Sequence, residues 1–110
     1  MSEKRYTVVE VPAPERLAKS KRRAKVVYLF GTMHGEHALR DTQFAVTLAG
    51  NVPLVNGALH GEDARMKAHK RAIDVCDYAI CLDAGGRPRG ESVAVNEYAD
   101  YWGKRVAMLE

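Results

Sequence analysis

The stretch DYAICLDAGGRPRGESVAVNEYADYWGKRV, residues Asp77–Val106, contains one complete structural unit. It opens with an uninterrupted apolar run, Tyr78–Leu82, which is typical of a parallel strand covered on both faces. A glycine-rich turn, Asp83–Gly90, comes next, and Ser92–Trp102 then has a helical pattern that Gly103 ends. This order predicts one unit of an open α/β sheet, in which ligand sites lie at the carboxyl ends of the strands.

The same order of strand, turn and helix occurs twice more upstream, and a final strand closes the chain. The predicted strands are Val26–Phe30, Val52–Val55, Tyr78–Leu82 and Arg105–Leu109, and the helices between them are Glu36–Ala49, Glu62–Cys76 and Ser92–Trp102. Because each connection is long enough for one helix, we expect an open parallel sheet with helices on both faces. We expect the strand order 2-1-3-4, which places the switch point between Gly31 and Asp83.

The first predicted helix has its apolar residues mostly on one side. They are Leu39, Phe44, Ala45, Leu48 and Ala49. A stripe of this kind predicts the face that packs on the sheet.

The basic residues are concentrated at the start of the chain. The net charge is +3, but residues 1–25 contain eight Lys/Arg and three Glu, and residues 26–110 contain nine Lys/Arg and eleven Asp/Glu. We therefore divide the chain into a basic leader and an α/β body, with Tyr6–Val11 as an extra edge strand that Pro12 and Pro14 end. The basic run either attracts nucleic acid or is a solvated segment, and no aromatic residue lies within it to stack on bases.

The bulk composition is that of a single globular domain. No apolar run approaches the roughly 20 residues of a membrane span, and the start MSEKRYTVVEV lacks the apolar region of a secretory signal. The only cysteines, Cys76 and Cys81, are expected as buried thiols rather than as a disulfide framework. These features predict a cytoplasmic protein with no membrane partner.

Two turns follow strands and could bind a ligand. The turn Gly31–Gly35 (GTMHG) opens a helix whose backbone N–H groups could bind an anion, although a plain turn explains it equally. In the second turn, Gly90 permits unusual backbone angles, and Ser92 is a candidate N-cap or phosphate ligand. Asp83 lies on the ligand side of its strand, whereas Asp77 lies at the opposite end, where a strand-entry turn explains it.

The histidines do not form a convincing metal site. His34 and His37 have the spacing of a shared pair with Glu36 between them, but no third ligand stands nearby in the sequence. We therefore predict neither a metal nor another cofactor.

The segments VVYLFGTMHG, CDYAICLDAGGRPRGES and EYADYWGKRVAML resemble the nucleoside 2-deoxyribosyltransferase-like superfamily, in particular its small bacterial and phage members. The resemblance covers Val26–Leu109 and implies a flavodoxin-like, Rossmann-like fold that forms homo-oligomers. It also implies cleavage of the N-glycosidic bond of a nucleoside or nucleotide. In such enzymes a helix glutamate attacks the sugar and forms a glycosyl ester that water or a second base displaces, as in retaining glycosidases.

The resemblance also implies site residues by position. Asp77 matches an acid that helps to hold the base or sugar, and Gly90 and Ser92 match the turn that holds the sugar or its 5′ phosphate. The residues that would line the base and sugar pocket are Gly31, Thr32 and Met33.

The nucleophile is the point at which this chain departs from the family. The family glutamate lies four residues before the alanine matched by Ala99, where this chain has Val95, and counting from the GES turn gives Asn96. Glu97 is the nearest glutamate and the predicted nucleophile, although two residues rotate by about 200° around a helix. Glu91, at the helix mouth, is another candidate carboxylate.

Two functions therefore remain open from the sequence. The first is an N-glycosidic transferase or hydrolase that acts through Glu97, and the second is a nucleotide-binding domain of the same fold without catalysis. The aromatic residues Tyr98, Tyr101 and Trp102 fit either a subunit contact or a core role.

Overall fold

A computed structural model describes residues 23–31, 37–57 and 59–109. They form a four-stranded parallel sheet in the order β2-β1-β3-β4, which confirms the predicted order. The extra edge strand predicted for residues 6–11 lies outside the described residues. The strands are β1 (Val26–Phe30), β2 (Val52–Leu54), β3 (Tyr78–Cys81) and β4 (Val106–Met108), and the helices are α3 (Ala38–Leu48), α4 (Glu62–Val75) and α5 (Glu91–Tyr101).

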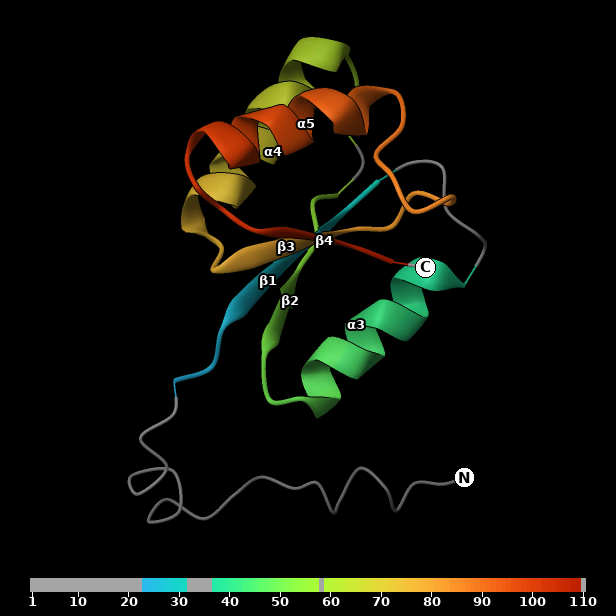
Figure 1. The fold of residues 1–110 in the computed structure, drawn as a ribbon, viewed down its shortest axis with the longest axis vertical. Coiled ribbons are helices and arrows are strands. Elements are labelled where there is room, and N and C mark those ends of the chain that lie inside the picture. Colours follow the sequence, from blue (N-terminus) through green and yellow to red (C-terminus); the bar gives the residue numbers. More distant parts are fainter. Residues whose placement is uncertain (1–22, 32–36, 58, 110) are drawn as a thin grey trace.

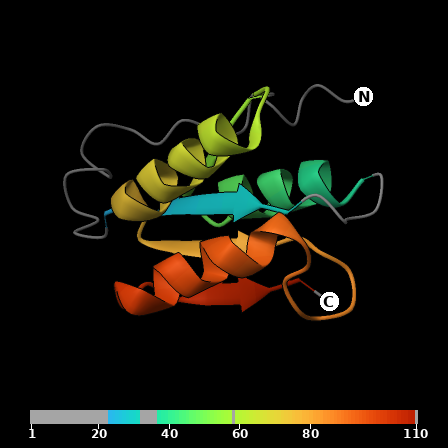
Figure 2. The same cartoon turned by 90° about the horizontal axis from the view of Figure 1, so that it is seen from above.

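The helices cover both faces of the sheet. Figure 1 shows α4 and α5 side by side on one face and α3 on the other, and Figure 2 shows the same layers from above. Strand β1 lies between β2 and β3, and Tyr28 of β1 pairs in register with Leu54 on one side and Ala79 on the other. The edge position of β2 suits Pro53, because proline cannot donate to a neighbouring strand.

Alternation along the strands divides the core into two layers. On β1, Tyr28 and Phe30 face α4 and α5, whereas Val27 and Leu29 face α3. All four side chains are buried, since β1 is covered on both faces. The buried residues of the α4 and α5 layer are Tyr28, Phe30, Ala72, Ile73, Cys76, Ala79, Cys81, Val95 and Ala99.

The predicted inner face of α3 is wrong. Phe44 and Leu48 are 64% and 70% exposed, and the buried residues of the helix are Thr42 and Val46. Leu39 is half-buried and packs in the same layer as Val46. The side of α3 that packs on the sheet includes Thr42. A prediction from the apolar residues alone therefore assigned the wrong side of the helix to the core.

Lys104 ties the end of α4 to the loop before β4. Its Nζ donates hydrogen bonds to the backbone oxygens of Ile73, Asp74 and Cys76, at 2.8, 3.3 and 2.6 Å. The last carbonyls of a helix have no partner within the helix, and they lie at the negative end of its dipole. Lys104 therefore satisfies these carbonyls and neutralises part of that charge.

Replacing Lys104 by methionine should lower the free energy of unfolding by about 2 kcal/mol, because it removes a charged donor from several carbonyls. Urea denaturation followed by circular dichroism measures the change. Lys67→Met, at an exposed position of α4, is the matched control and should change the free energy of unfolding by less than about 0.5 kcal/mol. Equal stability of the two variants would contradict the role of Lys104.

Candidate functional site

A cavity of about 280 Å³ lies at the carboxyl edge of the sheet. It is close to the lower end of the roughly 300–1,000 Å³ range of small-molecule sites. Its lining comes from the end of β1, the segment after β2, the residue after β3, the start of α3, α4 as far as His69 and the first residue of α5. This is where the strand order reverses direction around β1, the usual place of ligand sites in open α/β sheets.

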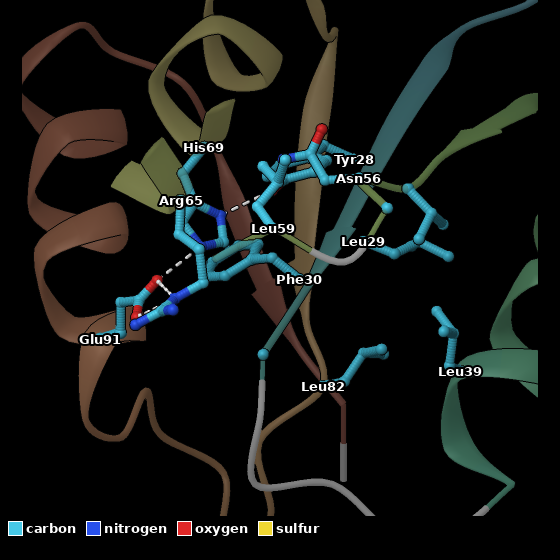
Figure 3. Close-up of a pocket in the computed structure, with 13 residues that line it drawn as sticks. Tyr28, Leu29, Phe30, Leu39, Asn56, Leu59, Arg65, His69, Leu82 and Glu91 are labelled. Atoms are coloured by element: carbon cyan, nitrogen blue, oxygen red, sulfur yellow. Dashed lines mark hydrogen bonds and ion pairs between the residues drawn. The ribbon is translucent and has the colours of Figure 1, made fainter. Parts of the chain in front are cut away.

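Apolar side chains that line the cavity lie on both sides of the end of β1 (Figure 3). Leu29, Leu39 and Leu82 form one side, next to α3, and Phe30 and Leu59 lie toward α4. These surfaces suit the flat faces of a small organic ligand.

A group of charged side chains lies on the α4 and α5 side of the cavity. Arg65 Nε donates to Oε1 and Oε2 of Glu91 at 3.0 and 3.3 Å, and His69 Nε2 lies 3.1 Å from Glu91 Oε2. Arg65 and His69 are four residues apart on α4 and so project from the same face. The side chain of Glu91 is 16% exposed, that of His69 15% and that of Arg65 39%. A mostly buried carboxylate thus lies between an arginine and a histidine.

The hydroxyl of Tyr28 extends this group toward β2. Tyr28 Oη lies 2.6 Å from His69 Nδ1 and accepts a hydrogen bond from Asn56 Nδ2 at 2.8 Å. Burial is the main cause that raises the pKa of Tyr28 above its ordinary value, and the hydrogen bond from Asn56 opposes it. Tyr28 therefore stays a neutral phenol through the physiological pH range.

Two of the sequence-predicted site residues, Gly31 and Glu91, line the cavity. Asp83 is fully buried next to Gly31 and accepts a hydrogen bond from the backbone N–H of Arg89 at 2.9 Å. The predicted switch point between Gly31 and Asp83 is therefore a close contact in the fold. Asp83 supports the turn after β3 from inside, and the cavity itself is lined by Leu82 from the same segment.

Asp77 lies at the opposite, amino edge of the sheet. Its Oδ2 accepts a hydrogen bond from the backbone N–H of Val26 at 2.7 Å, and its Oδ1 lies 3.8 Å from Arg23. The backbone N–H of Asp77 in turn donates to the carbonyl of Val26. These contacts join the starts of β1 and β3. The structure therefore favours the interpretation that Asp77 stabilises the turn that leads into β3.

The remaining described candidates lie on α5 but do not line the cavity. Glu97 is exposed and is not a lining residue, and Val95, at the family's position for the nucleophile, is completely buried in the core. The prediction that Ser92 caps the helix is wrong. The helix begins one residue earlier, at Glu91, because Gly90 adopts a φ of 55° and takes the cap position, and Ser92 is buried in the first turn. The candidates Thr32 and Met33 lie outside the described residues.

The sequence patterns did not indicate four polar residues that line the cavity: Tyr28, Asn56, Arg65 and His69. Asn56 follows the second strand at its carboxyl end, and the positional rule that indicated Asp83 could have found it. Tyr28 lies inside an apolar run, and this pattern predicted a buried strand rather than a site residue. The pairing of His69 with Glu91 joins residues 22 positions apart, and no local pattern signals it.

Other kinds of site find little support in the described part of the chain. Among residues 23–31, 37–57 and 59–109, no three His, Cys, Asp or Glu side chains are grouped as a metal site would require. Cys76 and Cys81 are buried and free, and burial raises the pKa of both thiols, so they remain protonated and unreactive. In the same ranges, no helix has the length and apolar character needed to cross a membrane.

No family model, no curated protein and no solved structure matches this chain.

Gly31 allows β1 to pass close to Asp83, and a side chain there should not be tolerated. A Cβ on Gly31 would lie 2.7 Å from Asp83 Oδ1 and 3.1 Å from the backbone nitrogens of Leu82 and Asp83, and its φ is 130°. We expect Gly31→Ala to lower the free energy of unfolding by about 2 kcal/mol. Gly57→Ala is the matched control, since Gly57 also lines the cavity but has nothing within 4 Å of an added Cβ. Denaturation curves that coincide for the two variants would refute this.

Proposed function

We propose that this protein binds a nucleoside or nucleotide in the cavity at the carboxyl edge of the sheet and cleaves its N-glycosidic bond, as a transferase or hydrolase. The observation that supports this most is the position of Glu91. It is the first residue of α5, it lines the cavity, and Arg65 and His69 orient its carboxylate. The proposal assigns the role of the helix glutamate to Glu91 in place of Glu97.

The choice of Glu91 follows from access to the cavity. Glu97 lies on the exposed surface of α5, whereas Glu91 is mostly buried at the cavity wall. A nucleophile must come within about 3–3.5 Å of the sugar carbon that it attacks. A ligand in the cavity therefore meets Glu91 and not Glu97.

The lining residues divide the work of binding and reaction. The apolar faces of Phe30 and Leu59 would contact the base or the sugar ring, and the amide of Asn56 would bind a base edge, since an amide both donates and accepts. A Glu91 oxygen then forms a bond to the anomeric carbon as the bond to the base nitrogen breaks. The bonding electrons leave with the base, which takes up a proton from solvent. Water or a second base then attacks the same anomeric carbon and loses a proton to solvent, and the bond from that carbon to the Glu91 oxygen breaks, which releases the carboxylate.

Arg65 and His69 hold the Glu91 carboxylate in place before the reaction. Charge-assisted hydrogen bonds of this kind are stronger than neutral ones. A carboxylate has about four acceptor positions, so the bonds from Arg65 and His69 leave room for a further contact with a ligand.

A second candidate function is nucleotide binding without turnover. The observation that favours it is the same ion pair, because Arg65 neutralises part of the charge on Glu91 and so weakens it as a nucleophile. The cavity would then act as a sensor or a store for its ligand.

We also propose a cytoplasmic location and a homo-oligomer. The two buried free thiols support the first, since such thiols are usual in reducing compartments. The exposed rings of Tyr101 and Trp102, 79% and 61% exposed and in edge contact, support the second as a subunit surface.

The test is the conversion of a panel of deoxynucleosides and their 5′ monophosphates by the purified protein. Release or exchange of the base is followed by liquid chromatography. Glu91→Gln should lower kcat by more than about a thousandfold, because it removes the attacking charge but keeps the shape. Glu97→Gln, a matched change on the same helix, should leave kcat unchanged.

Calorimetric binding to the same panel separates the two candidates. Binding with turnover that depends on Glu91 supports the transferase or hydrolase, and binding without turnover supports the second candidate. Turnover that depends on Glu97 instead would contradict the assignment of Glu91. A protein that neither binds nor converts any member of the panel would contradict both functions.

A further inference from the structure

Four side chains at the cavity form one continuous hydrogen-bond chain that runs from Asn56 through Tyr28 and His69 to Glu91. The successive distances are 2.8, 2.6 and 3.1 Å. The residues come from four elements, namely the segment after β2, β1, α4 and α5, and Figure 3 shows them meeting beside Phe30. Such a chain has a direction, because each group in it donates or accepts.

The direction follows from the two ends of the chain. The Asn56 amide nitrogen can only donate, so Tyr28 Oη accepts from it. A carboxylate without a proton can only accept, so the contact with Glu91 is a hydrogen bond when His69 Nε2 has the hydrogen. In a neutral imidazole the other nitrogen, Nδ1, is then an acceptor, and Tyr28 has the hydroxyl hydrogen to donate to it.

We propose that Tyr28 is a positioning residue, which fixes His69 in the tautomer that donates from Nε2 to Glu91. Tyr28 borders the cavity but is only 1% exposed, and its hydroxyl is bonded to His69 and Asn56, so we assign its effect on Glu91 to His69. With the opposite tautomer, a lone pair of Nε2 would face the carboxylate. Glu91 would then lose the hydrogen bond from His69 and keep only the one from Arg65 of α4. The catalytic consequence of this inference rests on the proposed function, but the direction of the chain is a property of the free protein.

The other groups around the imidazole agree with this arrangement. Glu91 of α5 faces Nε2, and the Tyr28 hydroxyl of β1 faces Nδ1. The Phe30 ring of β1 packs edge-on at 6.2 Å from the His69 ring, and Arg65, one turn away on α4, is bound to Glu91. A ring held on its edge and at both nitrogens has little freedom to turn over.

The first experiment measures the ¹⁵N and ¹H NMR signals of His69 and of the Tyr28 hydroxyl in the free protein at pH 8. We expect a hydrogen on Nε2, none on Nδ1, and a Tyr28 hydroxyl proton that exchanges slowly with water. In Tyr28→Phe, which keeps the ring, the Nδ1–H form should become detectable. Tyr98→Phe is the matched control, because it removes a hydroxyl bound to Asp74 outside the cavity, and it should leave the His69 signals unchanged. A hydrogen on Nδ1 in the unmodified protein, or the same His69 signals in Tyr28→Phe, would overturn the proposal.

The second experiment asks whether Tyr28 acts through His69, using the turnover of the nucleoside panel. Tyr28→Phe should lower kcat by about 10- to 100-fold with little change in KM, as for other groups that orient a functional histidine. In a His69→Gln background, where the side chain has no tautomers, the same change should have no further effect on kcat. An equal loss in both backgrounds would show a merely structural role. If no nucleoside is turned over, the proposed function fails, and the NMR result decides the inference by itself.

Discussion

The parallel pairing of β1 with both β2 and β3 is the constraint on which the rest of the structure depends. Three consecutive residues of β1 pair with β2 and four with β3. Because the strands are parallel, their carboxyl ends meet at one edge of the sheet, and the segments that follow them must gather there. Gly31 marks this point, since its missing side chain lets the end of β1 approach Asp83 after β3.

The site is a consequence of how this edge is covered. Alternation along β1 sends Tyr28 and Phe30 toward α4 and α5, and the first half of α4 presents Arg65 and His69 to them. Glu91 enters because α5 starts next to the same edge. The result is a small cavity with apolar walls and one oriented carboxylate, and the proposed nucleoside chemistry rests on this arrangement. At the opposite edge, Asp77 and Lys104 make hydrogen bonds to backbone groups and so stabilise the fold.

Much of the fold could be predicted from the sequence because it depends on local patterns. Continuous apolar runs predicted the four strands, and the single helix between each pair predicted parallel pairing and the order of the sheet. Helix ends differed by a residue or so, as at Glu91, because Gly90 could adopt the positive φ that starts α5 one residue early. The face of α3 was mispredicted because Thr42 is buried there as part of the inward stripe, while Phe44 remains exposed.

The candidate site was predicted only in outline. Position after a strand indicated Gly31, and Glu91 at the start of the last helix was among the candidates; both line the cavity. The sequence favoured Glu97 because a family pattern counts positions along the chain. Exposure depends instead on which side of α5 packs on α4 and the sheet, and Val95 and Ala99 occupy that side.

The sequence by itself determined the elements, their order and the edge at which a ligand would bind, since these follow from apolar runs, glycines and the handedness of parallel connections. Only the tertiary structure decided which polar groups meet at that edge. Tyr28, Asn56, His69 and Glu91 are separated by 22 to 41 positions along the hydrogen bonds that join them. Contacts over such separations depend on the packing of α4 and α5 against β1, and no stretch of sequence contains that information.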